Sequence, residues 1–214
     1  MARSKSSKQW LQEHFRDEFV QKSWKEGYRS RATYKLIEIQ EKDKLIRPGQ
    51  VIVDLGAAPG GWSQYAADIL RNKKGELNGK IIGLDILPID PMDGVTFIQG
   101  DFRDDSVLEQ LMAAISNYNG IDLVISDMAP NTSGMKAIDQ PRSMYLVELA
   151  YDFAVSNLKP GGGFLCKVFH GAGFDEFVKT TRQQFKRVTI RKPKASRARS
   201  VETYLLASEL KNDS

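Results

Sequence analysis

The stretch Gln50-Val-Ile-Val-Asp-Leu-Gly-Ala-Ala-Pro-Gly-Gly-Trp-Ser-Gln64 decides the fold of this 214-residue chain. Residues 51–55 form an apolar, β-branched run, which predicts a buried strand. The Gly- and Pro-rich residues 56–61 predict a turn, and the residues from Ser63 onward predict a helix. A strand, a glycine turn and a helix in this order open a nucleotide-binding βαβ unit. Asp54, at the end of the strand, is placed to receive a positively charged or hydroxyl-bearing group.

Strands and helices alternate along the rest of the chain. Further strands are predicted over 80–85, 95–99, 122–126, 164–169, 188–191 and 203–207, and helices over 105–116, 140–158 and 174–185. Residues 160–163 (Pro-Gly-Gly-Gly) predict a turn before the fifth strand. This alternation is typical of an α/β fold with a doubly wound, mainly parallel sheet of seven strands and helices on both faces.

The first 49 residues predict a basic, helical N-terminal extension. Apolar residues recur at helical spacing over 8–22, and Gly27 ends that helix. A second helix is expected with Ser30 as its N-cap. Residues 50–209 then form one domain and residues 210–214 a short tail.

The charge of the chain is distributed unevenly. Residues 1–31 carry eight Lys/Arg and four acidic residues, whereas residues 182–199 carry eight Lys/Arg and no acidic residue. The part between them is acidic, with fourteen Lys/Arg and twenty Asp/Glu. Basic segments at both ends of an acidic domain favour a partner with a phosphate backbone. A solvated charged face is the alternative for either segment alone.

Cysteine and hydropathy patterns restrict the class of protein. The single cysteine, Cys166, excludes an internal disulfide and a Cys-rich zinc site, and suits a reducing compartment. The two histidines show no metal-ligand spacing, so no metal is expected. We also expect no membrane span and no secretory signal, since the apolar runs are short and the first residues are polar. These patterns predict a cytoplasmic protein, and we expect a monomer.

Acidic residues follow successive predicted strands. Asp85, Asp101 and Asp127 end the second, third and fourth strands, and ligands bind outside the carboxyl ends of such strands. An acid at the end of the second strand commonly binds a ribose, which makes an adenosyl ligand the expectation. Lys167 lies within the otherwise apolar fifth strand, where a lysine is rare without a partner. Burial between carboxylates would poise it to take or steer a hydroxyl proton.

Five motifs carry a resemblance that covers residues 30–207. They are Ser30-Arg-Ala-Thr-Tyr-Lys-Leu36, Asp54-Leu-Gly-Ala-Ala-Pro-Gly-Gly-Trp-Ser-Gln64, Ser126-Asp-Met-Ala-Pro-Asn131, Lys167-Val-Phe169 and Arg199-Ser-Val-Glu-Thr-Tyr204. With these motifs the sequence resembles the FtsJ/RrmJ family of S-adenosylmethionine-dependent ribose 2′-O-methyltransferases. The resemblance implies a Rossmann-like S-adenosylmethionine methyltransferase fold. It also implies ribosomal RNA as partner, with a uridine of 23S large-subunit rRNA, within a large-subunit particle, as substrate.

The resemblance also assigns roles to single residues. It implies a catalytic Lys-Asp-Lys-Glu tetrad formed by Lys35, Asp127, Lys167 and Glu202. The contacts to S-adenosylmethionine would fall on Gly60, Trp62, Asp85, Asp101 and Asp127. Lys167 would act as general base or steer the hydroxyl, and Asp127 would hold it. From the charge pattern we expect RNA contacts from Arg29, Arg31, Arg191, Lys192, Lys194 and Arg197.

Other functions compete for the same fold class. An NAD-dependent oxidoreductase would need a Gly-x-Gly-x-x-Gly turn, which is absent from residues 56–61. An RNA cytosine-C5 methyltransferase would need a nucleophilic cysteine, and Cys166 is interpreted as a core residue. An exocyclic-amine methyltransferase would carry Asp/Asn-Pro-Pro-aromatic where this chain has Asp127-Met-Ala-Pro130. A non-catalytic RNA-binding ribosome-assembly factor on the same scaffold is the alternative of a different class.

Overall fold

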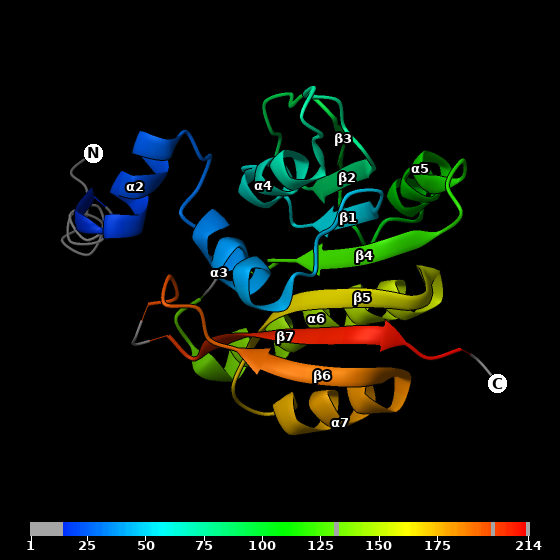
Figure 1. Ribbon diagram of the computed structural model, residues 1–214. Coiled ribbons are helices and arrows are strands. Elements are labelled where there is room, and N and C mark those ends of the chain that lie inside the picture. The colour runs from blue at the N-terminus through cyan, green and yellow to red at the C-terminus, as the bar shows by residue number, and fades with distance from the viewer. Residues whose placement is uncertain (1–14, 131–132, 198–199, 213–214) are drawn as a thin grey trace.

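The apolar run at residues 51–55 forms a central strand of a seven-stranded sheet that lies between two layers of helices (Figure 1). The computed structural model describes residues 15–130, 133–197 and 200–212. The strands are β1 (Val51–Leu55), β2 (Lys80–Asp85), β3 (Val95–Gln99), β4 (Ile121–Ser126), β5 (Leu158–Phe169), β6 (Phe185–Arg191) and β7 (Glu202–Leu210). The helices are α2 (Glu18–Glu26), α3 (Thr33–Asp43), α4 (Gly61–Leu70), α5 (Asp105–Ile115), α6 (Lys136–Asn157) and α7 (Phe174–Gln184).

The sheet is mixed. Its strand order is β3-β2-β1-β4-β5-β7-β6, and the neighbouring pairs from β3 to β5 are all parallel. The prediction of a mainly parallel sheet therefore holds for that part. β7 runs antiparallel to both β5 and β6, because a hairpin-like connection inserts it between them. The strand order reverses between β1 and β4, which is where ligands bind in open α/β sheets.

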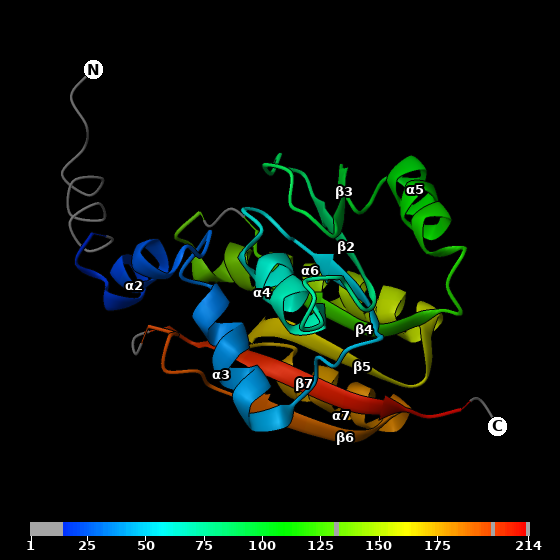
Figure 2. The same cartoon turned by 45° about the horizontal axis from the view of Figure 1, so that its top comes forward.

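The helices divide between the two faces of the sheet, as predicted. Helices α3 and α4 bury their apolar residues, Leu36 and Leu70 among them, against one face, together with Ile52 and Ile125 of the strands. Helices α5, α6 and α7 cover the other face and complete the larger core. Figure 2 shows α3 and α4 on the near side of the sheet and α6 and α7 behind it. Every residue of β1 is buried, as expected of a strand covered on both faces.

The fifth strand differs from the prediction at its start. The glycine-rich residues 160–163 were expected to form a turn, but β5 begins at Leu158 and runs through them. A register shift opposite β4 lies at this point, and Gly161 has a φ of 81°. The glycines therefore form a bulged beginning of the strand, in which Gly163 already pairs with Leu123.

The N-terminal helices differ from the prediction at Asp17 and at Ser30, and residues 8–14 of the first expected helix lie outside the described residues. Within the described residues, Asp17 interrupts the helix expected over 8–22: it caps α2 by accepting a hydrogen bond from the Phe19 N–H at 3.0 Å. Gly27 ends α2 as predicted, with a φ of 75°. Ser30 does not cap the next helix. Helix α3 begins at Thr33 after Ala32 and has no side-chain cap.

Candidate active site

A cavity of about 620 Å³ opens at the carboxyl ends of β1, β2 and β4. Its walls come from the turn after β1, the ends of β2 and β4, the residues after β3 and one face of α6. The volume lies in the range of small-molecule sites. Three of the acids predicted to bind the cofactor line it: Asp85, Asp101 and Asp127.

Asp85 is held in place by the backbone around it. Its two carboxylate oxygens accept hydrogen bonds from the N–H groups of Ala58 and Leu87, each at 2.9 Å. The first of these bonds ties the glycine turn to the end of β2. Each oxygen retains a lone pair that can accept from a sugar hydroxyl.

Asp101 is fixed by a side chain of its own loop. Arg103 donates to both of its carboxylate oxygens, at 2.9 and 2.5 Å. These hydrogen bonds lower the pKa of Asp101 to about 2. The carboxylate therefore stays ionised and oriented at the rim of the cavity at every pH at which the protein would be assayed.

The glycine turn keeps this cavity open. Gly56 has a φ of 78°, and a Cβ added to it would lie 2.5 Å from Cγ of Met128. A side chain at this position would thus collide with the chain that follows β4, in a conformation that L residues rarely adopt. The turn brings its backbone to the wall of the cavity because it has no side chain there.

Gly60 and Trp62 do not line the cavity. Gly60, with a φ of 105°, precedes α4, and Trp62 is 3% exposed. The Trp62 indole N–H donates to the carbonyl of Ala32 at 2.9 Å, so the side chain connects α4 to the start of α3. A contact of Gly60 or Trp62 with a cofactor would have to come from the backbone at the N-terminus of α4.

The predicted tetrad comes together as two ion pairs. Lys167 is 7% exposed, and its ammonium lies 3.2 Å from Oδ1 of Asp127 and donates to the Asp127 carbonyl at 2.6 Å. Lys35, from α3, lies 2.7 Å from Oε1 of Glu202. The register of the sheet explains the proximity, because β5 and β7 are neighbours and Lys167 pairs with Tyr204.

The second ion pair faces a second cavity. This cavity has a volume of about 560 Å³ and is lined by Arg31, Ala32, Lys35, Arg197, Ser200 and Glu202. Arginine and lysine side chains on its walls suit an anionic ligand. Asp127 lines the first cavity and Glu202 the second, so the four charged side chains lie between the two.

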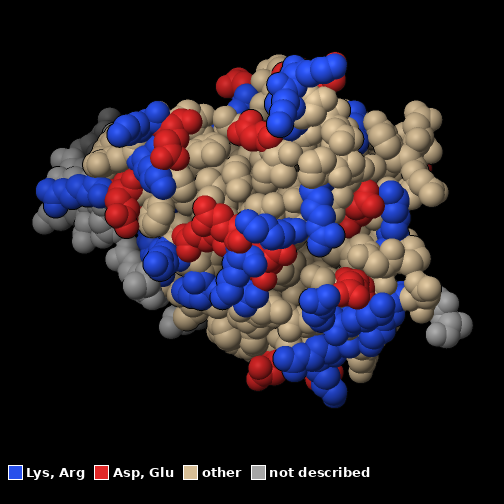
Figure 3. All heavy atoms as spheres, viewed as in Figure 1, with Lys and Arg blue, Asp and Glu red and all other residues tan. Residues whose placement is uncertain are grey.

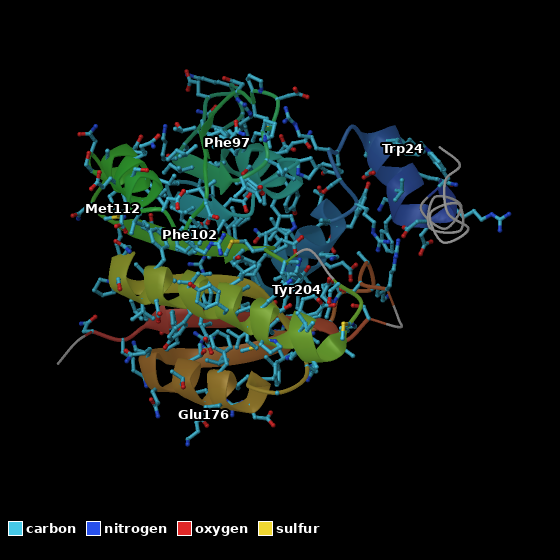
Figure 4. All side chains as sticks on the ribbon, turned by 180° about the vertical axis from the view of Figure 1, so that it is seen from behind. Trp24, Phe97, Phe102, Met112, Glu176 and Tyr204 are labelled. Carbon is cyan, nitrogen blue, oxygen red and sulfur yellow. The ribbon has the colours of Figure 1, made fainter. Side chains whose placement is uncertain are left out.

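Tyr204 connects the two ion pairs. Its hydroxyl donates to Oδ1 of Asp127 at 2.8 Å and lies 3.4 Å from Oε1 of Glu202. Burial, reinforced by these two carboxylates, raises the pKa of Tyr204 well above its usual value, so the hydroxyl stays protonated. Figure 4 shows Tyr204 inside the molecule, whereas Trp24 lies at the periphery on α2.

The Asp127 carboxylate is ionised. Burial alone would raise its pKa, but Lys167, Lys35 and the hydrogen bond from Tyr204 outweigh burial, so the pKa lies below the usual value. An aspartate held in this way is a poor proton acceptor. It can orient a lysine ammonium and stabilise positive charge beside it.

Two members of this network were not predicted as site residues. Tyr204 lies two residues after Glu202 on the same strand, and side-chain alternation in strands could have indicated that both point the same way. Ser196 donates to Oε1 of Glu202 at 2.8 Å. No sequence signal identifies Ser196, because its position depends on how the β6–β7 connection folds back.

Two other candidate residues have partners inside the protein. Asp54 is 1% exposed and accepts a hydrogen bond from the Ser63 hydroxyl at 2.7 Å. It does not line the cavity, so its expected role of receiving part of a ligand is replaced by a contact with α4. Cys166 is fully buried in the larger core, and burial raises the pKa of its thiol. This agrees with the interpretation of Cys166 as a core residue.

Among the predicted RNA-binding residues, the two near the N-terminus make internal contacts. The Arg29 guanidinium donates to the carbonyls of Asp90 and Pro91, at 2.7 and 3.0 Å. Arg31 pairs with Asp17 and donates to the carbonyl of Ala195. Arg31 still lines the second cavity, whereas the Arg29 guanidinium holds the loop before β3.

The four predicted residues of the β6–β7 connection differ from one another. Arg191 forms a two-point ion pair with Asp43 of α3, at 2.8 and 2.5 Å. Lys192 donates to the carbonyls of Ser200 and Glu202 across the base of the connection. Lys194 is exposed, and Arg197 lines the second cavity, where its Nε also lies 3.9 Å from Oδ2 of Asp17. Figure 3 shows acidic and basic side chains interleaved on this face of the molecule.

Two other kinds of feature are absent from the described residues. In those ranges no group of three or more His, Cys, Asp or Glu side chains could hold a metal ion. None of the helices described there is both long and apolar enough to cross a bilayer.

Comparison with known proteins gives consistent similarities. The sequence profile described as FtsJ-like methyltransferase matches residues 28–210. Proteins named "Ribosomal RNA large subunit methyltransferase E" from Dichelobacter nodosus and Legionella pneumophila strain Corby are 62% and 59% identical over 207 residues. These alignments cover 97% of this chain and 96% and 98% of the relatives. A Plasmodium falciparum crystal structure, described as a ribosomal RNA methyltransferase, superposes with a TM-score of 0.76 at 30% identity, over 87% of this chain and 100% of that chain.

Proposed function

Because this chain belongs to the FtsJ-like methyltransferase family, we propose that it transfers a methyl group from S-adenosylmethionine to a ribose 2′-hydroxyl of RNA. The names of the relatives support ribosomal RNA of the large subunit as the substrate. We further propose a uridine of 23S rRNA as the nucleotide, presented within a large-subunit particle.

One observation carries this proposal: the four charged side chains lie between two cavities of different character. The first cavity carries the acids Asp85 and Asp101, and the second carries the cations Arg31 and Arg197. Such an arrangement suits a cofactor with sugar hydroxyls on one side and a phosphate-bearing strand on the other. Lys167 and Asp127 lie where the two ligands would meet.

The residues of the first cavity fit S-adenosylmethionine. Asp85 would accept hydrogen bonds from the ribose hydroxyls, and Asp101 would contact the adenine end. The side-chain-free backbone at Gly56 leaves room for the ligand to pass toward Asp127. Gly60 and Trp62, at the start of α4, would contribute backbone groups.

When bound, S-adenosylmethionine supplies a methyl group on a sulfonium centre, whose S–C bond breaks as the new O–C bond forms. The protein must then align the 2′-hydroxyl and remove its proton. Within the described residues, the hydrogen bond and the ion pair of the Lys167 nitrogen both go to Asp127, which leaves a third direction for a ligand. We assign that direction to the hydroxyl. The Lys167 side chain binds the hydroxyl there and, once its ammonium has released a proton to solvent, accepts the hydroxyl proton, while Asp127 stabilises the ammonium that forms again.

Lys35 and Glu202 position the nucleotide. Lys35 reaches the second cavity from α3, and Glu202 holds its ammonium at 2.7 Å. A phosphate or sugar oxygen in that cavity would meet Lys35, Arg31 and Arg197 together. Exposed cations nearby, Lys194 in particular, would extend the contact along the strand.

The test is methyl transfer from tritiated S-adenosylmethionine to large-subunit particles and to deproteinised 23S rRNA. RNA from both reactions would be digested and the modified nucleoside identified by mass spectrometry. We expect 2′-O-methyluridine, at a higher yield from the particle. A base-methylated nucleoside would contradict the ribose assignment. RNA binding without any transfer would instead favour a non-catalytic assembly factor.

A further inference from the structure

The connection between β6 and β7 contains a turn over residues 193–196, of which all but Lys194 are buried. The Ser196 N–H donates to the Pro193 carbonyl at 3.0 Å, which closes the turn. Ala195 is fully buried and Ser196 is 5% exposed. Lys194, the other central residue, is exposed, so the N–H of the buried Ala195 is the group that most needs a partner.

Glu38 of α3 is the partner of both central N–H groups. Its two carboxylate oxygens accept from the N–H of Lys194 at 2.7 Å and from the N–H of Ala195 at 2.9 Å. Hydrogen bonds to a charged acceptor are the stronger kind, and two of them from one carboxylate fix both position and orientation. The turn is thereby attached to the middle of α3.

The same turn reaches the reaction site through its last residue. Ser196 donates its hydroxyl hydrogen to Oε1 of Glu202 at 2.8 Å, and this oxygen lies 2.7 Å from the Lys35 ammonium. Lys35 and Glu38 are three residues apart on α3, so they lie on one face of the helix. One turn of α3 therefore presents the lysine and also holds the loop that orients the partner of that lysine.

We propose that Glu38 is a positioning residue for methyl transfer, acting through the turn 193–196 and Ser196 on the Lys35–Glu202 pair. The inference rests on the proposed function, since it concerns the same site. Glu38 does not touch the reacting groups. It sets the geometry of Glu202, and a displacement of about 1 Å in a group of this kind can cost on the order of 100-fold in rate.

Neighbouring contacts do not duplicate this role. Arg191 and Asp43 secure the end of β6, before the turn. Arg31 donates to the carbonyl of Ala195, whereas Glu38 accepts from the N–H of that residue. Within the part of the chain that the structure describes, the N–H groups of Lys194 and Ala195 have Glu38 as their acceptor.

The experiment compares Glu38→Ala, Glu38→Gln and Glu41→Ala in the full chain. Glu41 lies on the same helix and is exposed, and among the described residues the N–H groups of the turn donate to Glu38 and not to Glu41, so Glu41 is the matched control. We expect Glu38→Ala to lower kcat at least tenfold while the Kd for S-adenosylmethionine stays within twofold. Glu38→Gln should recover part of the loss, because its amide oxygen can accept one of the two hydrogen bonds. Glu41→Ala should match the wild type.

A double-mutant comparison separates positioning from general damage. If Glu38 acts through Glu202, Glu38→Ala should reduce the rate of a Glu202→Ala enzyme by less than twofold. A full tenfold reduction in that background, or equal kcat values for Glu38→Ala and Glu41→Ala, would overturn the proposal. Circular dichroism and cofactor binding verify that each variant is folded.

If Glu38→Ala does not fold, Ser196→Ala tests the second link with the turn intact. It should lower kcat in the wild-type background and have little further effect beside Glu202→Ala. Equal effects in both backgrounds would overturn the proposal. Failure of the proposed function is distinguishable, because the wild-type enzyme itself would then transfer no methyl group to RNA.

Discussion

The phenolic hydroxyl of Tyr204 donates a hydrogen bond of 2.8 Å to Oδ1 of Asp127, the same oxygen that lies 3.2 Å from the Lys167 ammonium. The aspartate is therefore held from two directions, by one neutral donor and one charged donor. The Lys35 ammonium lies over the Tyr204 ring, with its nitrogen 5.6 Å from the ring centroid. The centroids of the Tyr204 and Trp62 rings are 5.7 Å apart. A single buried tyrosine thus orders both ion pairs.

Tyr204→Phe should leave the fold unchanged and lower the rate of methyl transfer. The phenyl ring preserves the packing with Trp62, while Asp127 loses one of its two side-chain donors. We expect kcat to fall about tenfold, which corresponds to roughly 1.4 kcal/mol in the barrier. S-adenosylmethionine affinity, measured by calorimetry, should change less than threefold. A wild-type kcat in the folded variant would show that the tyrosine only fills space.

Lys167→Ala should nearly abolish methyl transfer while cofactor binding survives. The variant removes the group assigned to the hydroxyl proton, a contribution of about 10²- to 10⁴-fold for general acid–base catalysis. It leaves Asp85 and Asp101 untouched at the other end of the cavity. Single-turnover rates and calorimetry on the same preparation measure the two effects separately.

Asp127→Ala should be compared with Lys167→Ala for both cofactor binding and methyl transfer. Asp127 lines the cofactor cavity and also pairs with Lys167, so its loss should weaken cofactor binding as well as transfer. If Lys167→Ala lost cofactor affinity to the same extent as Asp127→Ala, the lysine would have a structural role. Near-normal transfer by folded Lys167→Ala would assign the proton to another group.

The basic residues of the β6–β7 connection should be of two kinds: those that contact RNA and those that stabilise the fold. Lys194→Gln and Arg197→Gln should each reduce the slope of log affinity for RNA against log salt, by about 0.7 to 0.9 for each phosphate that the variant no longer neutralises. Arg191→Gln should instead lower the melting temperature, as should Asp43→Asn, because these two side chains pair with each other. Filter binding at several salt concentrations and thermal melts measure the two quantities. A reduced salt slope in Arg191→Gln alone would reverse the assignment.

The core of the fold could be predicted because its signals are local. β1, β2 and β3 match the expected ranges, since continuous β-branched runs and flanking turn residues specify buried strands directly. The boundaries of β5 and α3 could not be predicted in the same way. A bulged glycine run and a helix start without a side-chain cap depend on neighbours that are distant in sequence.

The motifs could indicate which side chains of the candidate site lie close together, whereas the catalytic roles of these residues stay a prediction. Lys35, Asp127, Lys167 and Glu202 converge, and the motifs alone could place them. The roles of the cations were harder to predict from charge, because Arg191 is paired with an acid 148 residues away and a one-dimensional count cannot reveal such a partner. For the same reason the sequence does not indicate a role for Glu38, because its partners Lys194 and Ala195 are distant along the chain.

Asp54 provides a test that does not involve catalysis. Burial, only partly offset by the hydrogen bond from Ser63, raises the pKa of Asp54 to about 7. Its Oδ1 has no hydrogen-bond partner among the described residues. The folded protein therefore binds a proton at Asp54 over a pH range in which the unfolded chain has already lost it.

Stability should consequently fall as pH rises through that range. Below the usual carboxyl pKa of about 4, Asp54 is protonated in both states and its ionisation does not lower the free energy of unfolding. Above pH 7, folding must bury a charge that the unfolded chain leaves in water. Asp54→Asn removes this penalty. The free energy of unfolding of the variant minus that of the wild type should therefore increase from pH 5 to pH 9, by about 3 kcal/mol at most. Urea unfolding at the two pH values measures the difference. Asp152→Asn, on the exposed side of α6, is the control for the exchange of an aspartate for an asparagine. An Asp54→Asn difference that stays constant with pH would mean that the carboxylate is already ionised in the folded protein at pH 5.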